Sequence, residues 1–576
     1  FCIRNSFCKG MLFTFDFHDF ADKIAKDDWI IDIWGDKRNI KDAEIILTGS
    51  MLKIHSSYNS LEDYLRCCKE NRYGFSVTKV IPKELENERN LNYQFIQSLK
   101  LNDDDIDELL QPTIDEITDI LGGDYRKAIL FLKGCYLTED LAKLQSPDFA
   151  KAIMVDKRMI EDPFVRYRIH NMIEKRINDA KVGVLKINGN FSIISGDPYS
   201  LCQSMFGLEV TGLLIAGEFY SRYWNERDVQ KVAAFRAPMT CHNNIRILRF
   251  KNTNEMQYWY RYMNRCTILN SWDTTTHAMN GADKDSDTIL TTNNPVILRG
   301  IEEREAILCV QKQAEKTIPT EEDLIQSNKN GFGDAIGTIT NKITSMFAVK
   351  AQFEEGSKEY KTLESRIMWG QHFQQLAIDK IKGVVGEPMP SEWYSYHANM
   401  IDKNDTEEIK EKKRFNIRIL ADKKPYFMAY IYPHEMKKYK TYINKAKRNC
   451  MMRFGITLDE LIDKDNKTED EEIFLKYYYL KMPLNTYPCL MNKICYKIEE
   501  EFDDVFKSFD RNSNFDYSIL KCDNIEYSKS TYDKIKIIYK KYKKEAQRYI
   551  VKIQKERIED FTKRDMRNVF IEKFKY

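Results

Sequence analysis

The chain has 576 residues, of which 43% are hydrophobic and 31% are charged, a composition that excludes a largely disordered protein. Its 90 Lys and Arg residues nearly balance 88 Asp and Glu residues, and the net charge of +2 excludes a uniformly basic surface. No apolar run approaches the roughly 20 residues that cross a bilayer, so we expect no membrane partner. Because the 13 cysteines include no Cys-x-x-Cys pair, we expect reduced thiols and a cytoplasmic protein. The chain starts at Phe1, and we expect that it begins inside a longer one.

The N-terminal region, residues 1–80, is expected to form short strands. Within it Met11–Phe17 alternates with aromatic residues, whereas Trp29–Trp34 and Ala43–Leu47 are apolar runs.

Residues 81–180 change to a helical period and are expected to form a helical connector. Asp103–Leu121 has apolar residues at helical spacing and is followed by Gly122-Gly123, which predicts a helix that ends there.

A second strand-rich block covers residues 181–300, where short segments broken by glycines are typical of a compact barrel. Residues 301–400 and 401–576 are expected to be helical. From Lys534 to Tyr576 the sequence has 15 Lys and Arg residues against 6 Asp and Glu residues. This basic tail predicts either a helix whose basic face binds the phosphate backbone of a nucleic acid or an ordinary solvent-exposed helix.

The strongest local motif is Asp283-Lys284-Asp285-Ser286-Asp287. Three carboxylates at alternate positions converge on one hard cation if the backbone curls, and oxygen ligands favour Mg²⁺, Mn²⁺ or Ca²⁺ over zinc. A calcium EF-hand loop would need Gly and Glu where Thr288 and Asn294 stand, so that site is disfavoured. A solvated acidic turn is the plain alternative.

Upstream of this motif stands Phe235-Arg236-Ala237-Pro238-Met239-Thr240-Cys241-His242. Together the two segments resemble the R-A-P-x-L-H and N-A-D-F-D-G-D segments in the catalytic barrel of the largest subunit of multisubunit RNA polymerases. The resemblance is closer to the single-chain two-barrel polymerases, which comprise the eukaryotic RNA-silencing enzymes and their phage and prophage relatives. Four further segments resemble that family in the same order: Ile3–Gly10 (IRNSFCKG), Ser50–Lys53 (SMLK), Gly337–Asn341 (GTITN) and Ala377–Gly383 (AIDKIKG).

The resemblance implies an α+β fold with two double-psi β-barrels embedded in a largely helical body. The first barrel, in residues 1–80, would be truncated at its N-terminus, and the second, in residues 181–300, would carry the aspartates. Residues 301–400 would contain a bridge-like helix that crosses the active-site cleft. Beyond about Met400 the sequence resembles nothing specific.

The resemblance also implies roles for individual residues. Asp283, Asp285 and Asp287 would hold a catalytic Mg²⁺, for which Mn²⁺ is an alternative, and two lysines, Lys9 and Lys53, would complete the catalytic set. Substrate contacts would come from Arg236, Pro238, His242, Asn280, Thr338, Asn341 and Lys342, and nucleic-acid contacts from Lys380 and Lys382. For His242 a buried structural histidine is an equal alternative. For Thr338, Asn341 and Lys342 the equal alternative is a position on a plain amphipathic helix without a substrate contact.

Three departures from the family pattern stand in or beside the aspartate motif. Ser286 replaces a glycine, Lys284 replaces an apolar or aromatic residue, and Gly281 replaces an asparagine that here stands one residue early, at Asn280. The first two bear on catalytic competence and the third bears on sugar discrimination.

The resulting hypothesis is template-directed RNA synthesis from ribonucleoside triphosphates on a DNA template, in a bacterial cytoplasm if the chain is phage-encoded. The first alternative is an RNA template, because the two polymerase groups share one active centre. The second is a degenerate barrel that binds nucleic acid without chemistry.

Overall fold

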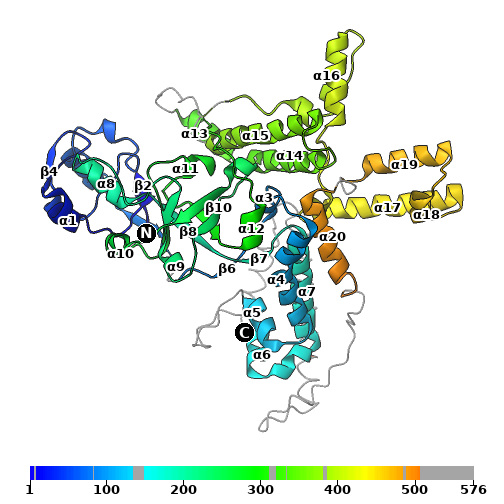
Figure 1. Cartoon of the computed structure of the whole chain (residues 1–576), viewed down its shortest axis with the longest axis horizontal. Coiled ribbons are helices and arrows are strands. Elements are labelled where there is room, and N and C mark those ends of the chain that lie inside the picture. Colours follow the sequence, from blue (N-terminus) through cyan, green and yellow to red (C-terminus); the bar gives the residue numbers. More distant parts are fainter. Residues whose placement is uncertain are drawn as a thin grey trace. The chain divides into compact units, whose positions relative to one another are not determined.

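The computed structural model describes residues 1–5, 8–81, 84–133, 148–309, 320–331, 334–380, 384, 386–483, 488–505 and 537. Among these, Phe1–Lys127 and residues 171–505 belong to one compact unit, and Ala128–His170 belongs to another. All the elements that surround the aspartate motif lie in the first unit (Figure 1).

A closed barrel forms the centre of this unit. Its strands are β8 (Asn190–Ser195), β9 (Glu218–Tyr220), β10 (Lys231–Phe235), β11 (Arg246–Phe250), β12 (Cys266–Leu269) and β13 (Thr288–Thr292), arranged in the order β10-β11-β9-β12-β8-β13. The pairs β9/β11 and β8/β12 are parallel and the others are antiparallel. Near-continuous apolar strands such as KVAAF and CTIL fill the interior, as expected where both faces are buried. The predicted α+β class with a closed barrel is confirmed.

The N-terminal region holds a smaller sheet, with β1 (Cys2–Asn5) between β2 (Cys8–Met11) and β5 (Ser76–Lys79). Beside it β3 (Trp29–Ile31) and β4 (Lys37–Asn39) form a hairpin. Within residues 1–5 and 8–81 these strands do not close, so the structure shows one barrel and not the predicted second one.

Two of the predicted N-terminal strands are wrong. After β2 ends at Met11, the aromatic side chains of Phe13, Phe15 and Phe17 pack into a cluster with Tyr199 and Trp259 beside the barrel. Their alternation therefore serves side-chain packing and not a backbone ladder. Ala43–Leu47 runs without strand pairing after a short 3₁₀ turn.

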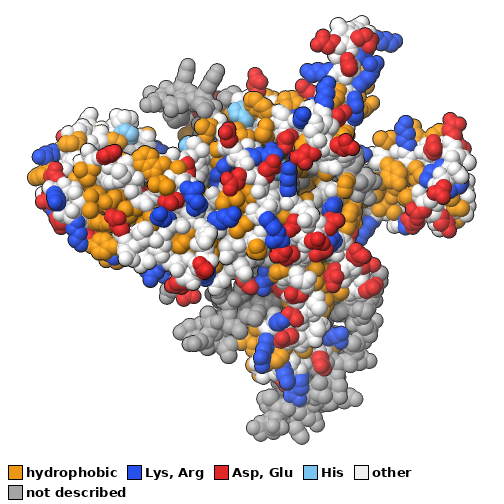
Figure 2. Space-filling model, viewed as in Figure 1, with side chains coloured by type: hydrophobic (Ala, Val, Ile, Leu, Met, Phe, Trp, Pro, Cys, Tyr) orange, Lys and Arg blue, Asp and Glu red, His pale blue; other side chains and the backbone are white. Residues whose placement is uncertain are grey.

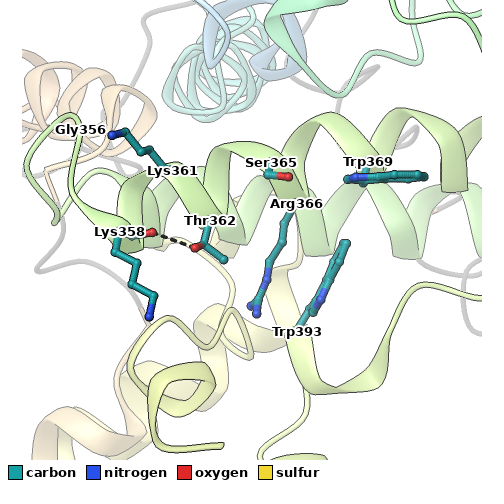
Figure 3. Close-up of a pocket in the computed structure, with 8 residues that line it drawn as sticks. All are labelled: Gly356, Lys358, Lys361, Thr362, Ser365, Arg366, Trp369 and Trp393. Atoms are coloured by element: carbon teal, nitrogen blue, oxygen red, sulfur yellow. Dashed lines mark hydrogen bonds between the residues drawn. The ribbon is translucent and has the colours of Figure 1, made fainter. Parts of the chain in front are cut away.

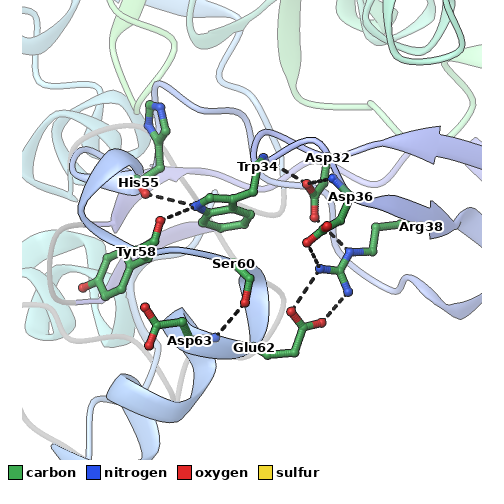
Figure 4. A network of polar contacts seen from close by, with 9 residues as sticks. All are labelled: Asp32, Trp34, Asp36, Arg38, His55, Tyr58, Ser60, Glu62 and Asp63. Carbon is green, nitrogen blue, oxygen red and sulfur yellow. Dashed lines mark hydrogen bonds and ion pairs between the residues drawn. The ribbon is translucent and has the colours of Figure 1, made fainter.

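A polar network fixes the turn that carries Lys53 (Figure 4). The Trp34 indole N–H donates to the backbone carbonyls of His55 at 3.1 Å and Tyr58 at 2.8 Å. Arg38 of the adjacent hairpin pairs with Asp32 in the hairpin turn at 2.8 Å, and it ties the hairpin to the helix α2 (Leu61–Glu70) through an ion pair with Glu62. The turn itself is attached to β2, because the backbone N–H of Lys9 donates to Met51 O at 3.0 Å.

The N-terminal sheet packs against the barrel through a small apolar cluster. Cys2 of β1 and Met11 of β2 are buried against Ile193 of β8. This contact brings β2, which carries Lys9, to the barrel strand that pairs with β13.

Helices surround the two β regions. The predicted helix is confirmed as α4 (Asp103–Leu121), which Asn102 and Asp105 cap reciprocally and which stops before Gly122. Two long helices, α14 (Ala335–Lys350) and α15 (Lys358–Asp379), pack against each other and against Cys241 next to the barrel. The strand β6 (Glu88–Asn90) pairs with β7 (Lys186–Asn188).

The remaining helices are α1 (Phe17–Phe20), α3 (Tyr93–Ile96), α5 (Tyr125–Lys133), α6 (Asp148–Val155), α7 (Pro163–Lys181), α8 (Pro198–Met205), α9 (Arg222–Asn225), α10 (Asn254–Trp259), α11 (Thr275–Ala278), α12 (Pro295–Gly300), α13 (Glu321–Gly331), α16 (Glu407–Arg418), α17 (Pro433–Phe454), α18 (Leu458–Asp463), α19 (Glu469–Lys481) and α20 (Leu490–Phe502). Apart from Ile537, the basic tail from Lys534 lies outside the described residues.

Charges of both signs are interspersed over the visible surface, as the near-zero net charge predicts (Figure 2). None of the helices in the described part of the chain combines the length and apolarity of a membrane span.

Candidate active site

The three aspartates lie on a short loop that leads from α11 into β13. The loop curls, because the Asp287 carboxylate accepts a hydrogen bond from the backbone N–H of Asp283 at 2.7 Å. Its end is anchored to the neighbouring strand, since Asp287 O accepts from the N–H of Ile194 at 3.1 Å. The loop therefore has the curled backbone that the sequence analysis required for convergence of the three carboxylates.

Lys9 reaches this loop from the N-terminal sheet. Its ammonium forms an ion pair with the carboxylate of Asp285, and the two side chains are 39% and 23% exposed. Cys2 of the same sheet lies 3.9 Å from the backbone oxygen of Asp285. The structure thus brings together two residues that the sequence predicted to be neighbours, from segments at opposite ends of the first 300 residues.

Arg236 approaches the loop from the other side, directly after β10. One terminal nitrogen lies 3.0 Å from Asp287 Oδ2, and the other donates to the carbonyls of Met279 at 3.0 Å and Asn280 at 2.9 Å. The side chain is only 14% exposed. The planar guanidinium therefore links β10, the end of α11 and the aspartate loop in one arrangement that a lysine cannot reproduce.

Behind Arg236 a buried amide network joins the barrel to α14 and α15. The Asn280 amide donates to Pro238 O at 2.5 Å and to Gln374 Oε1 at 2.8 Å, and Gln374 in turn donates to Thr340 Oγ1 at 2.8 Å. Asn244 donates to Asn280 Oδ1 at 3.3 Å. The backbone of Asn280 is left-handed, with φ of 54°, which asparagine tolerates better than most residues. Buried polar groups of this kind specify one packing only when they are all paired.

His242 is buried and does not face the aspartates. Its Nδ1–H donates to Ser98 O at 2.8 Å, and its ring packs edge-on against Phe347 of α14. Burial lowers the pKa of His242 to about 4, and the positive charges of Lys350 and Arg304 act in the same direction. The ring is therefore neutral at pH 7, as the structural alternative for this residue expects.

The other predicted site residues are spread over the surroundings. Lys53 is exposed on its turn beside β2, next to Leu52, which bridges Cys8. On α14, Thr338 is half-buried, the Asn341 amide donates to Tyr432 Oη at 2.7 Å, and the Lys342 ammonium lies 3.2 Å from the centre of the Tyr394 ring.

At the end of α15, Lys380 is exposed, and Lys382 lies outside the described residues. Sequence reasoning missed the buried amides Asn244, Gln371 and Gln374. The available signal was the pair of glutamines three residues apart on a helix that also carries the Ala377–Gly383 motif.

Two of the departures from the family pattern have a structural account. An added Cβ at Gly196 would lie 3.0 Å from Lys284 Nζ, so this ammonium lies beside Gly196. No ion pair joins Lys284 to its neighbouring aspartates within the described residues, and burial lowers its pKa. Ser286 has a φ of 122°, a region that suits glycine, which explains why a glycine is expected there.

The donor set of the loop suits a hard divalent cation. Asp283, Asp285 and Asp287 offer only anionic oxygens, which are the ligands that Mg²⁺ takes in proteins. Their carboxylates do not form a ready cage, since the described residues contain no cluster of three or more His, Cys, Asp or Glu side chains placed to hold a metal. Lys9 and Arg236 hold the carboxylates of Asp285 and Asp287 instead.

Comparison with known proteins finds two polymerases that are similar to parts of this chain. No protein-family model matches the chain. Over 233 residues it is 28% identical to the DNA-directed RNA polymerase YonO of Bacillus phage SPbeta, a match that covers 39% of this chain and 27% of the phage enzyme. The RNA dependent RNA polymerase QDE-1 from Thielavia terrestris is similar over 75% of this chain and 55% of its own, with 10% identity and a TM-score of 0.37, a likeness too slight to carry a role across. The match to YonO spans about a quarter of that enzyme's length, and it shows that this chain is a distant homologue of a phage DNA-directed RNA polymerase.

Proposed function

We propose that this chain carries the active centre of a template-directed RNA polymerase. The reaction is transfer of a nucleotidyl group from a ribonucleoside triphosphate to the 3′-hydroxyl of a nascent RNA. The observation that carries the proposal is the meeting of Lys9, from the N-terminal sheet, with Asp285, from the barrel loop. Together with the relationship to a phage polymerase, this juxtaposition favours an active centre over a solvated acidic turn.

The carboxylates would hold Mg²⁺, with Mn²⁺ as an alternative. As in other two-metal enzymes, this metal would lower the pKa of the RNA 3′-hydroxyl, and a second metal carried by the nucleotide would neutralise charge that develops on the leaving pyrophosphate. The oxygen-only donor set and the curl of the loop support this assignment.

Lys9 has the chemistry of a phosphate ligand in this proposal. Its ammonium is partly exposed, so it is able to exchange the Asp285 carboxylate for a phosphate oxygen of the incoming triphosphate. Lys53, on the turn attached to β2, is the second predicted cation, and its exposed position beside that strand is compatible with the same substrate.

Arg236 would act chiefly as a positioning residue. Three of its contacts are already made within the protein, to Asp287 and to the carbonyls of Met279 and Asn280. These contacts hold the last aspartate of the loop in one orientation, and such fixed positioning is a large part of how enzymes lower barriers. The contact with the ribose or a phosphate that the sequence predicted would use the guanidinium N–H donors that these three contacts leave free.

A DNA template is favoured because the phage relative is named a DNA-directed enzyme. An RNA template is the alternative. The two are separated by a primer-free extension assay with DNA and RNA templates of the same sequence, in a cytoplasm-like buffer with Mg²⁺ or Mn²⁺. If RNA is made from the RNA template and none from the DNA template, the proposed DNA template is rejected in favour of RNA.

The decisive variant is Asp285→Ala, which removes the ligand paired with Lys9. We expect nucleotide incorporation to fall below detection while template binding is unchanged, because strand affinity depends on Lys and Arg contacts to phosphates. Asp285→Asn keeps the shape and loses the charge, so it should fail almost as badly.

The matched control is Asp470→Ala, which removes a carboxylate from an exposed pair with Arg453 on the distant α17 and α19 helices. It should polymerise at the parental rate. Parental incorporation by Asp285→Ala would reject the aspartate site. No incorporation by the unaltered protein with either metal, while it still binds template, would favour the degenerate barrel.

A further inference from the structure

An open groove of about 760 Å³ follows the N-terminal half of α15 (Figure 3). Its lining includes Lys358, Lys361, Ser365, Arg366 and Trp369 from the helix and Trp393 from the segment that crosses it. It is a different surface from the aspartate loop, which none of these residues contacts.

The spacing of the groove residues explains why they share one face. Positions 358, 361, 365 and 369 recur at three- and four-residue intervals, and such positions lie in a row along a helix. The opposite face of α15 is apolar and buries Leu363 and Ile367 in the core that it shares with α14. The groove face is therefore the side of α15 that internal packing leaves open.

The groove is positively charged. Lys358, Lys361 and Arg366 contribute cations, and the lining includes no Asp or Glu. The Lys361 side chain is exposed, and its ammonium makes no hydrogen bond or ion pair with any residue in the described ranges, whereas its backbone N–H donates to Ser357 O within the helix. The Lys358 ammonium lies 4.8 Å from the centre of the Phe415 ring and is otherwise directed to solvent.

Arg366 supplies a fixed cation at the base of the groove. It is 6% exposed, its guanidinium lies 5.3 Å from the Trp393 ring, and one terminal nitrogen donates to Asn416 Oδ1 at 2.6 Å. The other terminal nitrogen has no hydrogen-bond partner within the described part of the chain. Because this nitrogen is itself buried, Arg366 adds positive charge beneath the groove and offers no exposed donor there.

The Trp369 side chain provides an exposed aromatic surface beside these cations. Its side chain is 56% exposed, although indole is among the side chains that gain most from burial. Its ring lies nearly perpendicular to that of His372 on the next turn of the helix, with the ring centres 5.8 Å apart.

A row of cations beside an open indole matches a ligand that alternates phosphates with flat rings. We propose that the α15 groove binds single-stranded nucleic acid, with phosphates on Lys358 and Lys361, the buried charge of Arg366 beneath them, and an unpaired base stacked on Trp369. A single strand is favoured because the bases of a duplex are already stacked on one another and cannot cover an indole. The inference rests on the proposed function, in which such a strand is substrate or product.

The position of the groove suits a strand that passes the barrel. The same helix carries Gln374, which bonds Asn280 behind the aspartate loop. At about 1.5 Å of rise per residue, Lys361 lies roughly 20 Å along α15 from that contact. The groove would therefore hold nucleotides a few positions away from the reacting end.

The test measures binding of a fluorescein-labelled oligodeoxythymidylate to the full chain by fluorescence anisotropy, without nucleoside triphosphates or divalent metal. Trp369→Ala should weaken binding about tenfold or more, and Trp369→Phe should restore most of the loss because it keeps a stacking face. Lys361→Ala should reduce the slope of log affinity against log salt concentration by about 0.7, the value for one phosphate contact in a single strand.

The matched control is Lys476→Ala with Tyr477→Ala, an exposed cation and an exposed aromatic on α19. Unchanged affinity in Trp369→Ala and Lys361→Ala would overturn the proposal, and so would displacement of the oligonucleotide by AMP at equal nucleotide concentration. Equal losses for a duplex of the same length would overturn the single-strand assignment. Because the assay contains no substrate, failure of the polymerase proposal is scored separately, by incorporation in Asp285→Ala.

Discussion

The two sides of the aspartate loop use the same kind of contact in different settings. On one side Arg236 pairs with Asp287, lies 14% exposed and makes two further bonds to backbone carbonyls. On the other side Lys9 pairs with Asp285, lies 39% exposed and comes from a separate sheet. We call these the closed side and the open side of the site.

The difference in exposure between the two ion pairs predicts that one contributes mainly to stability and the other mainly to catalysis. Removing one partner of a largely buried pair leaves the other charge desolvated and unpaired, whereas an exposed pair contributes little to stability. The closed side therefore holds the loop in shape. The open side keeps a cation whose present partner is easily exchanged, which is what a substrate contact requires.

The largest expected effect is on the closed side. Arg236→Ala should lower the free energy of unfolding of the main unit by about 3 kcal/mol, because Asp287 and two carbonyls lose their donor. Incorporation should be lost as well. The measurement is the urea midpoint, with Arg418→Ala as the control, since Arg418 forms an exposed pair with Glu359 at 2.9 Å. Equal midpoints for the two variants would contradict the closed-side assignment.

The second effect is a pH dependence of stability away from both sides of the loop, through the buried His242. Its folded-state pKa of about 4 is depressed by burial, below the unfolded value of about 6.5. Between these values the unfolded chain binds a proton that the folded chain does not. Stability should therefore rise with pH across this window, be complete above about pH 6.5, and fall by about 3 kcal/mol on acidification to pH 4.

The check compares urea unfolding at several pH values for the parent and His242→Gln, which should lose this part of the slope. His434→Gln, at an exposed histidine, should keep it. An unchanged slope in His242→Gln would mean that the ring is not held neutral by burial.

On the open side the effect should fall on activity alone. Lys9→Ala should reduce incorporation about 100-fold, in line with the loss of one preorganised electrostatic contact, and should shift the unfolding free energy by less than about 1 kcal/mol. Lys9→Arg should recover part of the activity. The control is Lys23→Ala, another exposed pair in the same region, with Asp19 at 2.9 Å. A loss of stability as large as that of Arg236→Ala would remove the distinction between the two sides.

Sequence patterns predicted the parts of the molecule that follow from local chemistry. The bounds of α4 follow from apolar residues at helical spacing over Asp103–Leu121 and from the glycine stop at Gly122, and the capping box at Asn102 is an addition of the structure. The barrel follows from short apolar strands separated by glycines. The approach of Lys9 to Asp285 was implied only by the resemblance to the two-barrel polymerases, because no local rule relates two segments so far apart.

The parts that were missed depend on tertiary packing. Met11–Phe17 has the alternation of a strand, but its partly buried aromatic rings pack against neighbours from the barrel region, and the backbone beyond Met11 pairs with no strand. Gln374 and Asn244 resemble surface amides in sequence, since nothing local shows that Asn280 and Thr340 will meet them in the core. Asn280, predicted to contact substrate, has its amide engaged in this network.

The smallest effect concerns the loop between the two sides. Ser286 holds a φ of 122°, where its Cβ is strained and glycine is not. Ser286→Gly should raise the free energy of unfolding by about 1 kcal/mol, since relief of this strain outweighs the added freedom of the unfolded chain. Incorporation should be equal to the parent or higher, because all three carboxylates remain. The matched control is Ser76→Gly in the exposed strand β5, which should cost about 0.5–1 kcal/mol because the backbone there is regular. If both glycines destabilise alike, Ser286 is unstrained, and the loop owes its curl to the bond between Asp287 and the Asp283 N–H alone.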